Sequence, residues 1–267
     1  MAKIDFSSYT DLRFERDDRI LNVIFNRPDK KNPVSGQMSL DLIRLLRELA
    51  YNEEFRVVVV TGAGTAFSAG GDLAVMKATL DHPESFLDAI TEVRDLVHAL
   101  IDCPKPVIAK VNGPAIGLGA TVALYCDMIF AAEDARIADP HIALGLVPGD
   151  GGAIIWPHLI GLPRAKQYLL TGDPLSGVEA AHIGLINRAV PRADLDKVVR
   201  DFAHHLADGP PRIMQFTKMA LNVALKREVS ALLDNSFAWE VVAAYSKDHK
   251  EAVMAWLEKR KPQFTGE

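Results

Sequence analysis

The sequence Ala66-Phe-Ser-Ala-Gly-Gly-Asp-Leu73 is a Gly-rich turn that directly follows the apolar run Val57–Val60. A second Gly-rich turn, Asn112-Gly-Pro-Ala-Ile-Gly-Leu-Gly119, follows the apolar run Val107–Val111. Each run predicts a buried strand, and each turn exposes backbone N–H groups. Either turn alone is equally a plain strand-to-helix connection that uses glycine for its backbone freedom. Two such turns that converge can hold one developing oxyanion, so the pair predicts an enzyme acting on a thioester or similar carbonyl.

Strands and helices are predicted to alternate through the first two thirds of the chain, which favours the α/β class. The apolar patterns predict strands at 20–25, 56–61, 106–111, 127–132 and 136–138, and helices at 38–49, 83–100, 118–126, 163–170 and 176–184. Ser176-Gly-Val-Glu179 has the form of a capping box at the start of the last of these helices. A Gly/Pro-rich loop is predicted at 144–152.

The pattern becomes entirely helical after about residue 192. Helices are predicted at 195–206, 211–224 and 230–259, with Pro210-Pro211 separating the first two. We therefore expect a core domain over residues 1–192, which carries the site, and a helical C-terminal module over residues 193–267.

Composition is that of an ordinary globular enzyme: 49% of the 267 residues are apolar and 24% are charged. The net charge of −5 argues against a nucleic-acid partner. The longest uncharged stretch, residues 111–126, is too short to span a membrane, and the acidic N-terminus has no apolar signal segment. The two cysteines and the histidines lack metal-site spacing. These observations predict a cytoplasmic protein without a metal or a resident cofactor.

Several ordered motifs resemble those of the crotonase superfamily, which contains enoyl-CoA hydratases and isomerases. They are Phe67-Ser-Ala-Gly-Gly-Asp-Leu73, Val111-Asn-Gly-Pro-Ala-Ile-Gly-Leu-Gly119, Cys126-Asp127, Gly145-Leu-Val-Pro-Gly-Asp-Gly-Gly152 and Leu170-Thr171-Gly172. The resemblance extends over nearly the whole chain. It implies a spiral of ββα repeats and a C-terminal helical region that forms trimers or dimers of trimers. It also implies an acyl-CoA substrate, with coenzyme A bound as part of that substrate.

The resemblance further implies the roles of individual residues. The backbone N–H groups of Gly71 and Leu118 match the two oxyanion donors of the family. The positions that contact coenzyme A in the family fall on Lys30, Lys31, Ala69, Trp256 and Lys259. For the three lysines, a solvated surface role is an equal alternative. Asp72 matches an acidic position that anchors the first turn by accepting backbone hydrogen bonds.

The chain departs from the family pattern at the two catalytic glutamates. The first glutamate position is Thr121 and the second is His141, in Asp139-Pro-His141. Hydration needs a base for water and an acid for the α-carbon. A threonine can only donate and accept hydrogen bonds, whereas a histidine can transfer protons near neutral pH. The two-glutamate mechanism therefore cannot be transferred to this chain.

Asp150 is the candidate replacement because Pro148-Gly-Asp-Gly-Gly152 places a carboxylate where most hydratases have a small residue. It could act as a base, an acid or a nucleophile, or it could cap the following helix. An exposed or supporting role for His141, and a pocket-wall role for Thr121, are the corresponding alternatives. The acyl group is expected to meet apolar side chains, for which the candidates are Leu73, Met76, Phe86, Ile142 and Trp156.

The leading interpretation is an enoyl-CoA hydratase/isomerase-like enzyme, a lyase or an isomerase, that stabilises a thioester enolate. Thioester hydrolysis, decarboxylation, and formation or cleavage of a carbon–carbon bond through Asp150 remain open. A catalytically weak protein that binds acyl-CoA is a further open alternative. RNA binding, known for an unusual relative, is opposed by the net negative charge.

Overall fold

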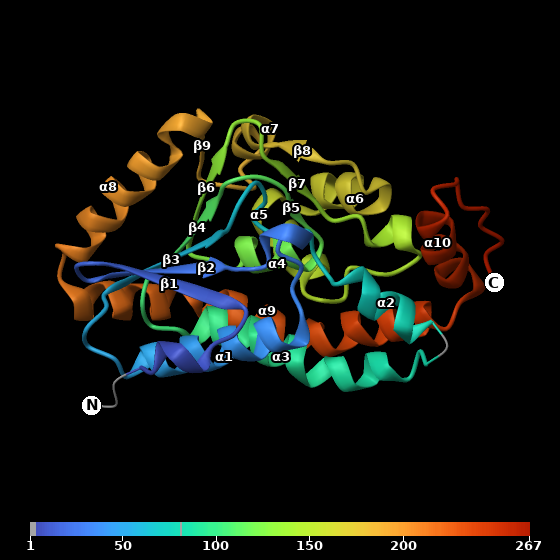
Figure 1. Ribbon diagram of the computed structural model, residues 1–267, viewed down its shortest axis with the longest axis horizontal. Coiled ribbons are helices and arrows are strands. Elements are labelled where there is room, and N and C mark those ends of the chain that lie inside the picture. The colour runs from blue at the N-terminus through green and yellow to red at the C-terminus, as the bar shows by residue number, and fades with distance from the viewer. Residues whose placement is uncertain (1–3, 81) are drawn as a thin grey trace.

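The computed structural model (Figure 1) describes residues 4–80 and 82–267, without the side chains of Leu73, Ala74 and Asp88. The strands are β1 Leu12–Asp17, β2 Ile20–Phe25, β3 Val57–Gly62, β4 Val107–Val111, β5 Ala115–Ile116, β6 Met128–Ala132, β7 Arg136–Ala138, β8 Leu175–Ser176 and β9 Arg188–Val190. The helices are α1 Gly36–Ala50, α2 Leu73–Thr79, α3 Ser85–Asp102, α4 Leu118–Leu124, α5 Gly152–Ile160, α6 Leu162–Thr171, α7 Gly177–His182, α8 Leu195–Ala207, α9 Pro211–Ala244 and α10 Lys247–Leu257. The predicted α/β class and C-terminal helices are confirmed.

Within the described residues, the strands form a six-stranded sheet in the order β1-β2-β3-β4-β6-β9 and a three-stranded sheet in the order β5-β7-β8. β1 and β2 are antiparallel, whereas β2, β3, β4, β6 and β9 run parallel to their neighbours. Val60 of β3 is paired with Ala109 of β4. Because neighbouring parallel strands end at the same edge, the loops that follow β3 and β4 begin side by side.

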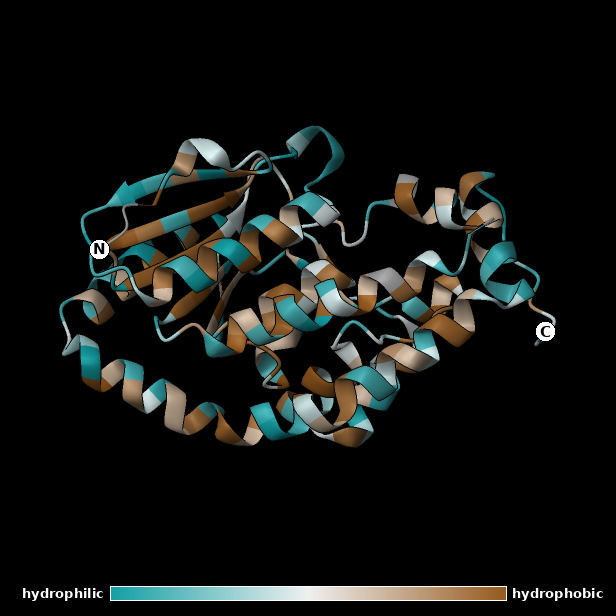
Figure 2. Ribbon diagram, turned by 90° about the horizontal axis from the view of Figure 1, so that it is seen from below, coloured by the Kyte–Doolittle hydropathy of each residue, from teal (hydrophilic) through white to brown (hydrophobic). Residues whose placement is uncertain are grey.

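Helices cover the large sheet and form one core with it (Figure 1). Ser35 caps α1 by accepting a hydrogen bond from the Met38 N–H, and this helix buries Met38, Leu42 and Leu45. α8 contacts β3, β4 and β6, while α3 packs against α1 and α9. Figure 2 shows inner strands that are largely hydrophobic and helices with mixed faces, as expected of an amphipathic outer layer. In the described part of the chain, every helix is too short or too polar to cross a membrane.

The C-terminal helices differ from the prediction. Instead of helices at 211–224 and 230–259, one continuous helix, α9, covers Pro211–Ala244. Residues 225–229 contain no glycine or proline, and the buried Val229 and Leu233 continue the inward face across the predicted gap. The real break comes at Ser246, whose side chain accepts from the His249 N–H and starts α10. Whether residues 193–267 act as a separate oligomerisation module stays a prediction, although Val199 and Leu233 belong to the main core.

Two shorter helices, α2 and α5, were not predicted. α5 lies between the predicted loop at 144–152 and the predicted helix at 163–170, and it contains Pro157. The capping box of α7 is confirmed, with the Ser176 and Glu179 side chains bonded to each other's backbone N–H groups.

Candidate active site

The two Gly-rich turns pack directly against each other. The Ser68 N–H donates to the Pro114 carbonyl at 3.0 Å, and the Ile116 N–H donates to the Ser68 carbonyl at 3.1 Å. Gly70 has a φ of +92°, and a Cβ at this position would lie 2.6 Å from the Ile116 carbonyl oxygen. A side chain at Gly119 would similarly meet Ser68 at 2.6 Å. Glycine is therefore required at both positions for the turns to approach this closely.

This approach brings the segments of Gly71 and Leu118 together. Leu118 is the first residue of α4, so its N–H has no partner within the helix and lies at the positive end of the helix dipole. In the described part of the chain, neither the Gly71 N–H nor the Leu118 N–H donates a hydrogen bond. Both groups are available to a ligand, as the predicted oxyanion role requires.

Asp150 and Thr121 are in contact and buried. The Thr121 hydroxyl donates to Asp150 Oδ1 at 3.1 Å, and the Gly152 N–H donates to the same oxygen at 3.2 Å. Asp150 is 4% exposed, and its Oδ2 has no hydrogen-bond partner among the described residues. The carboxylate therefore receives a helix N–H, as the capping alternative expects, and also keeps one oxygen for other chemistry.

His141 joins this group from the other side. It lies at the start of a short 3-10 segment, His141–Leu144, and its Nδ1 is hydrogen-bonded to Asp139 Oδ1. Its Nε2 is 3.8 Å from Asp150 Oδ2. His141 is 8% exposed, so the alternative of an exposed histidine is wrong. A carboxylate on one ring nitrogen fixes the tautomer and leaves Nε2 facing the site.

Glu240 completes the cluster, and the sequence analysis missed it. This residue of α9 is 5% exposed, and its Oε1 lies 4.0 Å from His141 Nε2. The available signal was a single acidic residue within the apolar stretch Phe237-Ala-Trp-Glu-Val-Val242. We refer to Asp139, His141, Asp150 and Glu240 as the acidic cluster.

The acidic cluster surrounds one imidazole with three buried carboxyl groups. Burial favours a neutral His141, but the Asp139 and Asp150 carboxylates outweigh it and raise the pKa of His141 well above its ordinary value. Burial raises the pKa of Asp150, an effect that the positive charge of His141 opposes. Burial also raises the pKa of Glu240 to about 8, again opposed by His141. At neutral pH the cluster therefore holds a charged imidazole and at least one protonated carboxyl group.

The same side chains have the composition of a metal site. Asp139, His141 and Asp150 each offer a ligand atom, and these atoms lie within 4.8 Å of one another. One nitrogen and several carboxylate oxygens would suit a divalent transition metal. The sequence analysis predicted no metal, because these residues are not spaced as a recognisable motif. The expected absence of a metal stays a prediction.

The residues predicted to contact coenzyme A lie beside the first turn and at the C-terminus. Lys30 and Lys31 are exposed, and their loop is fixed to the turn because the Ala69 N–H donates to the Lys31 carbonyl at 2.9 Å. Asp72 forms an ion pair with Arg27 at 3.0 Å, which adds a side-chain partner to its predicted anchoring role.

Trp256 lies in the last turn of α10 with 52% of its surface exposed, and Lys259, two residues beyond the end of this helix, has a φ of +56°.

The candidate acyl-lining residues have different environments. Phe86 packs with Val93, Phe237 and Val241 in a small apolar cluster, which we call the apolar wall. Trp156 is instead fully buried in the main core. Ile142 is 40% exposed, Met76 approaches Gly71, and the side chain of Leu73 lies outside the described residues.

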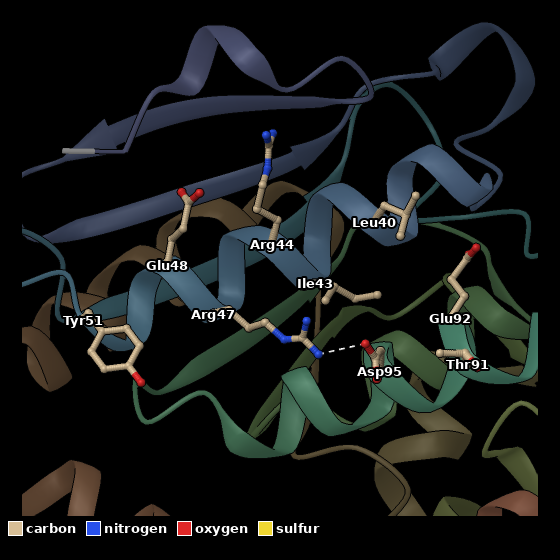
Figure 3. A pocket seen from close by; sticks show the side chains of 9 residues that line it. All are labelled: Leu40, Ile43, Arg44, Arg47, Glu48, Tyr51, Thr91, Glu92 and Asp95. Carbon is tan, nitrogen blue, oxygen red and sulfur yellow. Dashed lines mark hydrogen bonds and ion pairs between the residues drawn. The ribbon is translucent and has the colours of Figure 1, made fainter. Parts of the chain in front are cut away.

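A separate cavity of about 690 Å³ lies between α1 and α3 (Figure 3). It is open to solvent, and Arg47 and Asp95 form an ion pair of 2.9 Å across it. Leu40, Ile43 and Tyr51 supply apolar surface. None of the residues of the two turns or the acidic cluster lines this cavity, so it is not the candidate active site.

Comparisons with known proteins give matches of one family over nearly the whole chain. The family model for enoyl-CoA hydratase/isomerase matches residues 15–267. A probable enoyl-CoA hydratase of Rhodobacter capsulatus is 35% identical, covering 97% of this chain and 99% of its own. The 1,2-epoxyphenylacetyl-CoA isomerase of Escherichia coli is 34% identical, covering 92% of this chain and 95% of its own. A crystal structure of an enoyl-CoA hydratase/isomerase from Mycobacterium paratuberculosis superposes with a TM-score of 0.86 at 35% identity, over 92% of this chain and 98% of that one.

Proposed function

Because the chain belongs to the enoyl-CoA hydratase/isomerase family, we propose that it binds an enoyl-CoA or related acyl-CoA and forms the thioester enolate by moving a proton. The observation that carries this proposal is the buried contact of Asp150 with Thr121, on the helix that begins at the second Gly-rich turn. This contact holds a carboxylate next to the proposed oxyanion site.

The backbone N–H groups of Gly71 and Leu118 hold the thioester oxygen. Removing a proton from the α-carbon transfers negative charge to this oxygen, and fixed donors stabilise that charge without having to reorganise. One such donor is worth roughly 3–4 kcal/mol of barrier. The start of α4 adds its dipole to the Leu118 donor.

Asp150 is the base. Its Oδ1 is held by Thr121 and Gly152, so its unpartnered Oδ2 takes the proton. Its raised pKa makes it a stronger base than an exposed aspartate, while the positive charge of His141 keeps it ionised. His141 is held protonated beside Asp139 and is therefore an acid in the resting enzyme.

Hydration is a second candidate, favoured by the hydrogen bond between Asp139 and His141. An imidazole that has lost its Nε2 proton and is oriented by a carboxylate can activate water. This would place His141 in the role that a glutamate has in two-glutamate hydratases. Hydrolysis, decarboxylation and carbon–carbon chemistry would use the same oxyanion site, whereas a protein that only binds acyl-CoA would leave the substrate unchanged.

The predicted partners are part of the proposal. Lys30, Lys31 and Lys259 are proposed to contact the phosphates of coenzyme A, with Trp256 and the Ala69 carbonyl as further contacts. A homotrimer or a dimer of trimers would cover exposed apolar residues of α9, among them Phe216, Leu221 and Trp239. We place the protein in the cytoplasm and without a nucleic-acid partner.

Mass spectrometry of acyl-CoA thioesters incubated with the protein in heavy water tests the proposal. Crotonyl-CoA, 3-hexenoyl-CoA and phenylacetyl-CoA are suitable probes. Deuterium in the recovered thioester supports enolate formation, and added water identifies hydration. Release of free CoA identifies hydrolysis. Recovery of all three probes unchanged, despite measurable binding, would refute the proposed enzyme and leave the binding protein.

A further inference from the structure

Glu240 and Asp150 reach the site from different elements, Glu240 from α9 and Asp150 from the loop before α5. Asp150 is bonded to Thr121 of α4, close to the turn that carries Leu118. Glu240 comes from α9, where Phe237, one turn earlier, and Val241 both belong to the apolar wall. Asp150 is therefore attached to the helix that begins with Leu118, whereas Glu240 lies beside the apolar surface proposed to receive the acyl chain.

Helix α9 holds Glu240 firmly against the Asp150 loop. The Ser236 hydroxyl donates to the Gly149 carbonyl at 3.3 Å, and a Cβ on Gly149 would lie 2.6 Å from Glu240 Oε2. Oε2 is buried and accepts no hydrogen bond from the described residues, although the nearby Gly149 backbone lowers the pKa of this carboxyl group to a small extent. Glu240 shares its buried face of α9 with Ser236, and its Oε1 lies 4.0 Å from His141 Nε2, so the carboxyl group is directed at the acidic cluster.

The surroundings of Glu240 favour its protonated form. The charged groups that face it are His141, Asp150 and Asp139, and α3 contributes the apolar side chains of the wall. From α10, His249 is hydrogen-bonded to the Leu144 carbonyl. A second ionised carboxylate next to Asp150 would be costly in this buried site, so Glu240 carries a proton at neutral pH.

We propose that Glu240 is the acid that protonates a distal carbon of the acyl group after Asp150 has taken a proton from the α-carbon. This inference rests on the proposed function. It makes the favoured reaction a 1,3-proton shift that moves a double bond from the β,γ to the α,β position.

The protons and electrons balance within the site. Asp150 takes the C2 proton of a 3-enoyl-CoA, and the electron pair enters a dienolate whose oxygen is held by Gly71 and Leu118. The Glu240 proton then forms the new C4–H bond, which leaves a 2-enoyl-CoA, a protonated Asp150 and an ionised Glu240. His141 Nε2 lies within 4.0 Å of both carboxyl groups and returns the proton from Asp150 to Glu240.

The test separates the two proton transfers with 3-hexenoyl-CoA in heavy water. Mass spectrometry and NMR follow deuterium at C2 of the unreacted thioester, and ultraviolet absorbance follows the conjugated product. For E240Q we expect exchange at C2 to stay within about threefold of wild type and isomerisation to fall by about 100-fold or more. D150N should lose both reactions. E228Q changes a glutamate on the exposed side of the same helix and should lose neither.

Two further measurements distinguish the loss of the Glu240 acid from misfolding of E240Q. E240D keeps an acid with a shorter reach, so it should isomerise faster than E240Q. The infrared carbonyl band of a protonated carboxyl group should be present in the wild type at pH 7 and weaker in E240Q.

Each remaining outcome would contradict either the role of Glu240 or the proposed function. Isomerisation by E240Q at the wild-type rate, or exchange without isomerisation in the wild type, would overturn the role of Glu240 alone. A wild type without exchange on any of the three thioesters would overturn the proposed function, and the role of Glu240 with it.

Discussion

Thr121 donates a hydrogen bond of 3.1 Å to Asp150 Oδ1, and both side chains are buried. Thr121 lies on α4 and Asp150 in the loop before α5, so this hydrogen bond joins two separate elements of the site. His141 Nε2 lies 3.8 Å from Oδ2 of the same carboxylate. A hydroxyl donor, a carboxylate and an imidazole therefore meet in one buried group.

The oxyanion donors can be tested at Leu118, because proline is tolerated at the first position of a helix and has no N–H. L118P should lower the rate of deuterium exchange by about 100-fold to 1,000-fold. L118A keeps the N–H and should exchange at a rate close to wild type. Acyl-CoA binding, measured by calorimetry, should be similar in all three proteins. An unchanged exchange rate in folded L118P would remove Leu118 from the mechanism.

The alkaline limit of activity should depend on Asp139. This carboxylate helps to raise the pKa of His141, so D139N should lower that pKa, and His141 should lose its proton at lower pH. We expect the alkaline limb of the pH–rate profile for isomerisation to move down by about one pH unit or more. The profile of D139N, compared with that of the surface variant D134N, provides the measurement. Identical alkaline limbs would show that His141 does not carry a required proton.

Glu240 should make the folded protein less stable as pH rises. Its pKa is 4.5 when unfolded and about 8 when folded, so between these values the folded state binds more protons than the unfolded state. Stability therefore falls as pH increases from 4.5 to about 8, and this contribution is lost above that range. E240Q should flatten the decline. Urea unfolding at pH 5 and pH 8.5, with E228Q as the reference, measures the difference; parallel declines would contradict the buried, protonated glutamate.

Metal removal should leave proton exchange intact. Asp150 and His141 are proposed to transfer protons and Asp139 to hold His141, although these three side chains could also bind a divalent cation. Extended treatment with EDTA should change the rate of exchange by less than about twofold. A loss of activity that zinc or manganese restores would identify the acidic cluster as a metal centre.

Much of the fold could be predicted from local patterns. The valine run of β3, the Ser176 capping box and the amphipathic period of α3 each have a simple physical cause that acts over a few residues. The break between α9 and α10 was misplaced because the residues around 225–229 are neither strongly apolar nor helix-breaking. In that region, packing of Val229 and Leu233 determines the structure.

The site was predictable only where its residues lie on recognisable motifs. His141, Asp150 and Thr121 were found because each lies in or near one of the ordered sequence motifs. Glu240 was missed because it reaches the site from a helix far along the chain, and one acidic residue in a helix is ordinarily a solvated one. Only the packing of α9 on the Asp150 loop reveals it.

The central claim is that Asp150 removes a proton from a bound acyl-CoA, and D150N tests it most directly. Asparagine keeps an oxygen for the Thr121 and Gly152 hydrogen bonds but cannot take the proton. Deuterium incorporation at the α-carbon of 3-hexenoyl-CoA should fall by about 100-fold to 10,000-fold in D150N, with acyl-CoA binding unchanged and D173N, on the exposed surface, at the wild-type rate. Exchange by D150N at the wild-type rate would show that another group is the base.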